Sequence, residues 1–188
     1  EIAVSLGLRE AELIGLRWQD IDFAKRTLAV SGQILRRRQP NGKSKLMRLP
    51  PKTKKSVRTL PISDSLVATL RTHQTHIYAE RLKCGAAWRD HDLLFPTSIG
   101  TPYDRASLMG HFKRTLAAAG LPTTVRFHDL RHTAASLMLD GGAQLADVSA
   151  ILGHGNPAIT ARIYAHSYDE GRRRTVEGME RRLRRGQK

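Results

Sequence analysis

The sequence predicts a mainly α-helical domain with a small antiparallel β-sheet near its N-terminus, an α+β arrangement. Apolar residues recur at the spacing of amphipathic helices along most of the chain. Residues that favour strands gather between positions 27 and 61, where a Pro-Asn-Gly turn interrupts them. The length of 188 residues and the hydrophobic content of 40% suit one domain with a buried core. We therefore expect a single domain over residues 1–188.

The first third of the chain is expected to hold a short helix and the whole sheet. Leu8, Leu13 and Leu16 recur at helical spacing, which predicts an amphipathic helix over residues 9–17. The β-forming residues predict three strands, and two prolines end the second of them. The expected strands cover residues 27–35, 45–49 and 57–61.

The rest of the chain is expected to be helical apart from an irregular segment over residues 85–103. Ser63 and Asp104 are of types that cap helix N-termini, and Pro157 suits the first turn of a helix. Glycines follow several of the expected helix ends. The expected helices cover residues 63–83, 104–119, 128–140, 145–152 and 157–164, and the tail from residue 167 onward is compatible with a helix.

The positive charge is concentrated in two segments. The chain has 32 Lys and Arg residues against 17 Asp and Glu residues, a formal net charge of +15. Residues 25–58 contain 12 basic residues and no acidic one, and residues 172–188 contain 8 basic and 2 acidic residues. This distribution favours surfaces that bind a polyanion, above all nucleic acid. The alternative is a solvated basic loop and a solvated basic tail.

Composition also excludes several classes of protein. No apolar run reaches the length of a bilayer span, and the first residues lack the basic start and apolar core of a signal peptide. Cys84 is the only cysteine, which excludes an internal disulfide and a cysteine-based zinc site. A reducing, cytoplasmic location is therefore expected. Because no initiator Met opens the sequence, we expect a fragment of a longer protein.

Two segments place charged side chains where they could bind a phosphate. In GLREAELIGLRW, Arg9 stands at the first turn of the expected helix, and Glu12 is its neighbour on the same face. In FHDLRH, His128 and Arg131 are three residues apart and share a helix face. An Arg fork suits a phosphate, and a His can donate a hydrogen bond or move a proton. A surface ion pair and a helix-capping His are the alternatives.

A third segment, LGHGNPAITARIY, carries a candidate nucleophile. Gly153 and Gly155 flank His154, so the backbone can turn sharply and present the imidazole. Tyr164 follows ten residues after His154. Its hydroxyl, with a pKa near ~10, needs nearby positive charge or a base to act as a nucleophile. A packing role for this Tyr is the alternative.

Together these segments resemble the catalytic domain of the tyrosine recombinases, the phage integrase family. A fourth segment, PPKTKKSVRTLPI, resembles the part of the family's β-hairpin region that carries a catalytic Lys. The four motifs occur in the family's order and cover nearly the whole chain. The catalytic residues that the resemblance implies are Arg9, Lys52, His128, Arg131, His154 and Tyr164, with Glu12 in a supporting role.

The resemblance implies that a Tyr attacks a DNA phosphodiester, leaving a 3′-phosphotyrosyl bond and a free 5′-hydroxyl. Neither a metal, ATP nor another cofactor is needed, because the covalent bond stores the ester energy. The two arginines would bracket the phosphate, Lys52 would protonate the leaving oxygen, and His154 would add a donor. His128 would help to move the proton of Tyr164 or hold the phosphate.

The resemblance also implies partners. We expect double-stranded DNA, a homotetramer on that DNA with exchange of the tail over residues 167–188, and a role in integration by a mobile element. The N-terminal domain with which the family clamps the other face of DNA is expected to be absent. The residues expected to contact DNA are Arg36, Arg37, Arg38, Lys43, Lys45, Lys54 and Lys55.

Three alternatives stay open. A type IB topoisomerase would share the Arg, Lys, His and Tyr chemistry, although the LGH box and the short chain fit a recombinase better. A non-catalytic basic DNA-binding module would explain the charge but not the ordered motifs. A metal site at His128 and His132 lacks an evident carboxylate partner, so we expect no metal.

Overall fold

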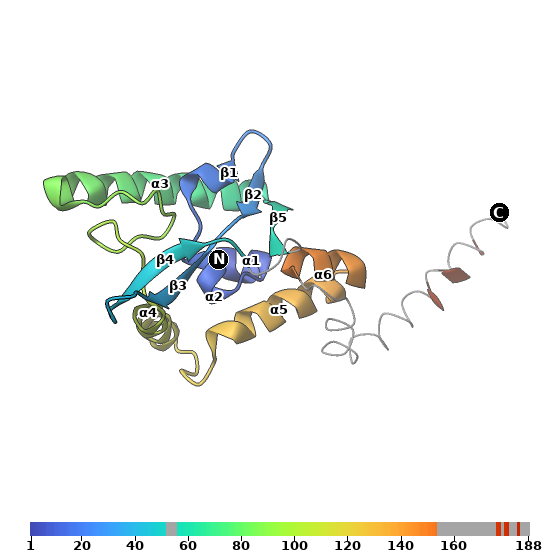
Figure 1. Ribbon diagram of the computed structural model, residues 1–188. Coiled ribbons are helices and arrows are strands. Elements are labelled where there is room, and N and C mark those ends of the chain that lie inside the picture. Colours follow the sequence, from blue (N-terminus) through green and yellow to red (C-terminus); the bar gives the residue numbers. More distant parts are fainter. Residues whose placement is uncertain (52–55, 154–175, 178, 181–183, 185–188) are drawn as a thin grey trace.

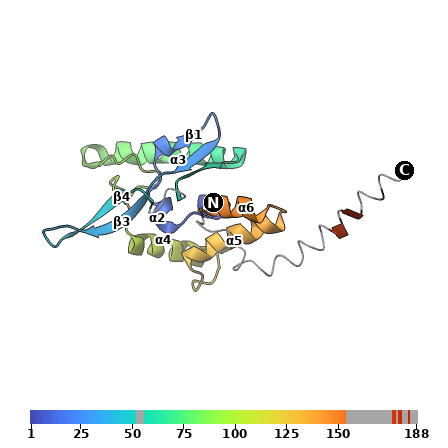
Figure 2. The ribbon, with the colours of Figure 1, turned by 45° about the vertical axis from the view of Figure 1, so that its right-hand side comes forward.

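The computed structural model describes residues 1–51, 56–153, 176–177, 179–180 and 184. The long helix α3 lies on one side, and α4, α5 and α6 lie on the other (Figures 1 and 2). Helices α1 and α2 and the β3–β4 hairpin lie between them, and the β1–β2 hairpin lies at the level of α3. The helices are α1 (Ile2–Leu6), α2 (Glu10–Leu13), α3 (Asp64–Cys84), α4 (Arg105–Ala118), α5 (Phe127–Asp140) and α6 (Leu145–Leu152), with short 3₁₀ turns at Trp18–Asp20 and Gly85–Ala87. The strands are β1 (Ile21–Asp22), β2 (Thr27–Val30), β3 (Gln33–Arg38), β4 (Ser44–Leu49) and β5 (Arg58–Pro61).

The fold class is confirmed, but the described strands form two antiparallel sheets rather than one. Among them, β2 pairs with β1 and β5, whereas β3 pairs with β4. The single strand predicted over residues 27–35 is therefore wrong, because it breaks at Ser31-Gly32. The guanidinium of Arg48 fills the space at the break, where a Cβ on Gly32 would lie 2.4 Å from Arg48 Cζ. Arg48 donates there to the carbonyl of Gly15 and to Asp20.

The first predicted helix is also shorter than expected. The prediction of residues 9–17 is wrong beyond Leu13, where α2 ends. Gly15 packs so closely against β3 that a Cβ would lie 2.9 Å from the Cα of Gln33. After this turn, the carbonyl of Leu16 accepts a hydrogen bond from the amide of Leu94 at 2.8 Å. Packing against two distant segments thus ends the helix.

The later helices agree with their predictions. Ser63 caps α3 by accepting a hydrogen bond from the amide of Leu66, and Asp104 caps α4 by accepting one from the amide of Ser107. α5 begins one residue earlier than predicted, and α6 has the predicted bounds. The helix predicted over residues 157–164 lies outside the described residues. No helix in the described part of the chain is long and apolar enough to cross a membrane.

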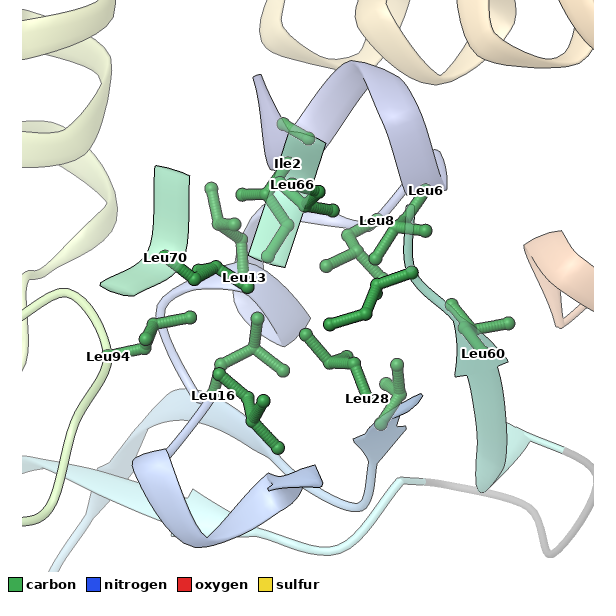
Figure 3. Packing of buried hydrophobic residues seen from close by; sticks show 14 of the residues in the cluster. Ile2, Leu6, Leu8, Leu13, Leu16, Leu28, Leu60, Leu66, Leu70 and Leu94 are labelled. Atoms are coloured by element: carbon green, nitrogen blue, oxygen red, sulfur yellow. The ribbon is translucent and has the colours of Figure 1, made fainter. Parts of the chain in front are cut away.

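The main hydrophobic core lies between α3 and the central layer. Figure 3 shows leucines from α1, α2, β2, β5 and α3 packing together. A smaller cluster joins α5 and α6 through Ala135, Val148 and Leu152. α1 also packs against α5, and α6 packs against β5. These contacts bring the loop after α1, the start of β5 and the C-terminal end of α6 together.

Candidate active site

The loop after α1 presents Arg9 next to a buried carboxylate. Arg9 has an extended backbone and directly precedes α2. Glu12 accepts a hydrogen bond from the Arg9 amide at 3.0 Å through Oε2 and one from Arg9 Nη1 at 3.0 Å through Oε1. The amide would otherwise be an unsatisfied donor at the helix start. The Arg9 side chain stays 39% exposed, whereas that of Glu12 is 4% exposed. The buried carboxylate of Glu12 thus orients Arg9, while the side chain of Arg9 remains accessible to solvent.

Glu12 has a second partner, Arg58 on β5, which was not singled out from the sequence. Arg58 Nη2 donates to Glu12 Oε2 at 3.0 Å, and Nη1 donates to Oε1 at 3.2 Å. The side chain of Arg58 is 7% exposed. It stands in the PPKTKKSVRTLPI segment, but no spacing rule links it to a residue 46 positions earlier. The only signal in the sequence for an inward-facing Arg58 was its position at the start of a strand whose apolar face is buried.

The electrostatics keep Glu12 ionised. Burial raises the pKa of this carboxyl, but hydrogen bonds and charge from Arg58, followed by those from Arg9, lower it more. The net result is a pKa below the ordinary value. Glu12 therefore remains a negatively charged acceptor between two guanidinium groups.

Arg131 lies on the inner face of α5 and is 3% exposed. Its Nη1 donates to the carbonyl of Gly7 at 2.6 Å, and its Nη2 donates to the carbonyl of Leu152 at 2.6 Å. Gly7 has a φ of 58°, and a Cβ there would lie 2.5 Å from Leu152 Cδ2. Only glycine suits this close approach. Arg131 thus ties the loop before Arg9 to the end of α6.

His128 lies on the exposed part of α5, near its start. The partial burial of its ring lowers its pKa below the ordinary value, and the charges of His132, Arg131 and Arg9 lower it further against a weaker opposing effect of Asp129. His128 therefore lies within electrostatic range of both arginines. Its ring meets that of His132 edge to face, with centroids 4.9 Å apart. The described residues contain no cluster of three or more His, Cys, Asp or Glu suited to a metal ion.

The structure thus brings together Arg9, Glu12, His128 and Arg131. Lys52, His154 and Tyr164, together with Lys54 and Lys55, lie outside the described residues. Two described residues that are close in sequence to Lys52 and His154 do contact Arg58, which binds Glu12. The carbonyl of Ser56 accepts a hydrogen bond from Arg58 Nη1 at 3.1 Å, and that of Ile151 accepts one from Arg58 Nε at 2.6 Å.

Apart from Lys25 and Arg26, the described basic residues of the segment over residues 25–58 form an outer and an inner set. The outer set is exposed on the β3–β4 hairpin, whose far end projects beyond the helices in Figure 2. Arg48 and Arg58 instead face inward and pair with Asp20 and Glu12. Arg36 pairs with Asp104 at 3.3 Å. The described members of the outer set are Arg36, Arg37, Arg38, Lys43 and Lys45.

Comparisons with known proteins agree on one family. The sequence profile described as "Phage integrase family" matches residues 1–171. A "Tyrosine recombinase XerC-like" protein of Caldanaerobacter subterraneus subsp. tengcongensis is 38% identical over 94% of this chain and 46% of its own length. An "Integrase" of Streptomyces ambofaciens is 33% identical over 60% of this chain and 30% of its own length.

Among solved structures, the Tn1549 transposon integrase in complex with circular intermediate DNA is similar at a TM-score of 0.74 and 26% identity. That match covers 95% of this chain and 57% of the other. XerA recombinase has the same fold, with a TM-score of 0.67 over 95% of this chain and 54% of the other, at 23% identity. The chain thus spans about half the length of these relatives. With a family profile matched over most of its length, the chain belongs to the phage integrase family.

Proposed function

We propose that residues 1–188 form the catalytic domain of a tyrosine recombinase, which cleaves and rejoins DNA at specific sites through a 3′-phosphotyrosyl intermediate. The observation that carries the proposal is that Arg131, three residues after His128 on α5, donates to the carbonyl of Gly7 just before Arg9, while Glu12 holds Arg9 in place. The names of the similar proteins, recombinases and integrases, support the same reaction class.

The two arginines supply what a phosphodiester cleavage needs most. Negative charge grows on the non-bridging oxygens as a nucleophile attacks phosphorus. Guanidinium groups that are already oriented stabilise this charge without reorganising, and their planar forks match the oxygen pair. Arg9, being exposed and oriented, would approach the phosphate from the surface, and Arg131 would approach it from the protein side.

The remaining roles rest on sequence position within the family motifs. Tyr164 attacks phosphorus, and the bond from phosphorus to the 5′-oxygen breaks. Lys52 gives its proton to that leaving oxygen, and His154 donates a hydrogen bond to the phosphate. His128, whose lowered pKa favours the neutral imidazole, can accept the proton of Tyr164.

The decisive experiment uses a DNA substrate with a nick next to the cleavage site, so that the cleaved fragment diffuses away. The protein should become covalently trapped on this DNA, and Tyr164→Phe should abolish the adduct. Tyr168→Phe is the matched control. It removes a tyrosine hydroxyl four residues further along the chain and should leave the adduct intact. An adduct mapped to Tyr168 would contradict the assignment of the nucleophile, and the absence of any tyrosine adduct would contradict the mechanism.

A second assay separates recombination from topoisomerase activity. A recombinase joins ends from two DNA sites, so it should exchange strands between matching sites. A type IB topoisomerase would instead relax supercoiled plasmid that lacks any such site. Relaxation of supercoiled plasmid that lacks a recombination site would overturn the recombinase proposal, but it would be compatible with the covalent tyrosine mechanism.

Double-stranded DNA is the proposed substrate, and the β3–β4 hairpin is proposed to contact its phosphates together with Lys54 and Lys55. Arg37 and Arg38 are exposed on this hairpin. Replacing both by Gln should weaken DNA binding to the same extent for all DNA sequences. The slope of log binding constant against log salt concentration should become shallower by about 2, one unit for each lost phosphate contact. An unchanged salt slope would remove the hairpin from the interface.

The proposed assembly on DNA is a homotetramer in which residues 167–188 dock on a neighbouring subunit, within a mobile element's integration reaction. A cytoplasmic setting is proposed with it, consistent with the single Cys84. Recombination requires four coordinated strand cleavages, so deletion of the residues after Tyr168 should impair recombination more than cleavage of a single site. Equal loss of both would contradict tail exchange.

A further inference from the structure

We propose that Arg58 is a positioning residue of the active site, which fixes Arg9 through Glu12 and aligns with it the backbone at Ser56 and Ile151. The inference rests on the proposed recombinase function. It adds to the family motifs a residue that they did not single out, and it assigns that residue no direct contact with DNA.

The contacts of Arg58 reach two distant segments and the residue two positions before it in its own segment. Both carboxylate oxygens of Glu12 accept hydrogen bonds from its Nη atoms, at 3.2 and 3.0 Å. Its Nε donates to the carbonyl of Ile151 at 2.6 Å, and its Nη1 also donates to the carbonyl of Ser56 at 3.1 Å. In the sequence, Ser56 follows Lys52 by four residues and Ile151 precedes His154 by three. One side chain thus joins the segments that carry three proposed catalytic residues.

The route from Arg58 to Arg9 passes through a single carboxylate. Glu12 Oε1 accepts from both Arg58 Nη1 and Arg9 Nη1, and Oε2 accepts from both Arg58 Nη2 and the Arg9 amide. A shift of Arg58 would therefore turn the carboxylate and carry the exposed guanidinium of Arg9 with it. Because a misplacement of about 1 Å at a reacting group can cost 10²-fold in rate, this route can control catalysis.

The planar fork of arginine is needed for this arrangement. A lysine keeps the charge but offers one ammonium group, which cannot reach a carboxylate and two separate carbonyls in fixed directions. The backbone of Gly153 packs closely against the guanidinium of Arg58, since a Cβ on Gly153 would lie 2.8 Å from Arg58 Nη1. Its φ of 66° also favours glycine. The guanidinium therefore has little freedom to move away from this carboxylate and these carbonyls.

The test measures Arg58→Lys with the nicked DNA substrate, at saturating DNA and well below the melting temperature. We expect the rate of covalent complex formation to fall by about 10²-fold. The dissociation constant for DNA should not change, because Arg58 is buried and acts on the reacting groups rather than on binding. Loss of affinity with an unchanged rate would overturn the proposal, as would a normal rate in the folded variant.

Arg48→Lys is the matched control. Arg48 is also an internal arginine, 18% exposed, that donates to a carbonyl, a carboxylate and a hydroxyl, at Gly15, Asp20 and Ser31. None of these partners is a proposed catalytic residue, and among the described contacts none hydrogen-bonds to the carboxylate of Glu12. The amide of Gly15 donates only to the main-chain carbonyl of Glu12, at 3.0 Å. The control should lose thermal stability and keep its cleavage rate. An equal loss of rate in both variants would reduce Arg58 to an ordinary structural residue.

A double variant tests the route through Glu12. If Arg58 acts through this carboxylate, Glu12→Gln combined with Arg58→Lys should be no slower than the slower single variant. Multiplying losses would overturn the proposed route. The unmodified protein distinguishes failure of the two proposals. If it forms no covalent adduct with DNA, the recombinase function is wrong. If it forms an adduct at a rate that Arg58→Lys does not change, only the positioning role is wrong.

Discussion

Arg9 and Arg131 are proposed to do the same work on a phosphate, yet the protein holds them in different ways. Arg131 is 3% exposed and donates to two main-chain carbonyls from different segments. Arg9 has a side chain that is 39% exposed and hydrogen-bonds to the carboxylate of a residue three positions away. The first arginine is part of the fold's internal connections, whereas the second is attached to a local carboxylate. Catalysis and stability should therefore be coupled at Arg131 and separable at Arg9.

The charges of their partners differ as well. Carbonyl oxygens orient a guanidinium without neutralising it, because they carry only partial charge. The carboxylate of Glu12 offsets positive charge, but it serves both Arg9 and Arg58. One carboxylate shared by Arg9 and Arg58 does not neutralise both guanidinium groups, which suits a site that must attract a phosphate.

The largest effect is expected for Arg131→Lys. Losing the fork should lower the cleavage rate by about 10²–10³, and leaving a buried carbonyl without its donor should cost about 1–3 kcal/mol of unfolding free energy. Single-turnover cleavage and denaturant unfolding measure the two effects. Near-normal cleavage in Arg131→Lys would remove this residue from the chemistry.

Arg9→Lys should slow cleavage by a similar factor, about 10²–10³, because it also removes an oriented donor. Its unfolding free energy should change by less than about 1 kcal/mol, since Lys keeps the charge at a partly exposed position and Glu12 keeps both hydrogen bonds from Arg58. The same two assays apply, and DNA binding serves as the control that both variants should pass. Equal losses of stability in the two variants would break the contrast between the arginines.

Glu12→Gln probes the local attachment through pH. The pKa of Glu12 is lower in the folded protein than its ordinary value of 4.5. Its stabilising contribution is therefore complete above that value and is lost as the pH falls through the lower folded value. The stability difference between the unchanged protein and Glu12→Gln should be largest near neutral pH and shrink in acid. Glu10→Gln, which alters only a pair with Arg105, is the control and should show little pH dependence.

The smallest effect is electrostatic and concerns His128. The positive charge of Arg9 contributes to the lowered pKa of His128, so Arg9→Gln should raise that pKa. Titration of the His128 ring protons by NMR gives the measurement. Arg26→Gln removes a charge that lies in a pair with Asp64 and should leave the pKa of His128 unchanged. An unchanged value in Arg9→Gln would place Arg9 too far away to share a phosphate with His128.

The helices could be predicted from the sequence where their signals are local. Ser63 and Asp104 cap the helices that they were expected to cap, and α6 follows its apolar periodicity. The break between β2 and β3 could not be predicted, because its cause is the side chain of Arg48 packing on Gly32. β-Forming residues on both sides of Ser31-Gly32 gave the pattern of one long strand.

The site divides in the same way. Arg9, Glu12, His128 and Arg131 were predicted from motifs; in the structure Arg9 pairs with Glu12, and Arg131 donates to the carbonyl two residues before Arg9. The interior role of Arg58 depends on contacts across 46 and 93 residues, which no local pattern encodes. A basic, acid-free segment predicts a polyanion surface, but it does not tell which of its arginines turn inward to a carboxylate from elsewhere in the chain.

The hydrogen bonds of Arg131 also have a consequence for the order of folding. The bond to Gly7 joins residues 124 positions apart, and the bond of Arg58 to Ile151 spans 93. Helices form from local contacts, whereas contacts over such separations require closure of long loops. During synthesis from the N-terminus, the second carbonyl partner of Arg131 becomes available only when Leu152 has emerged. Arg131 therefore cannot reach its final arrangement before Leu152 has been made, and a nascent chain that ends earlier lacks one of its two carbonyl partners.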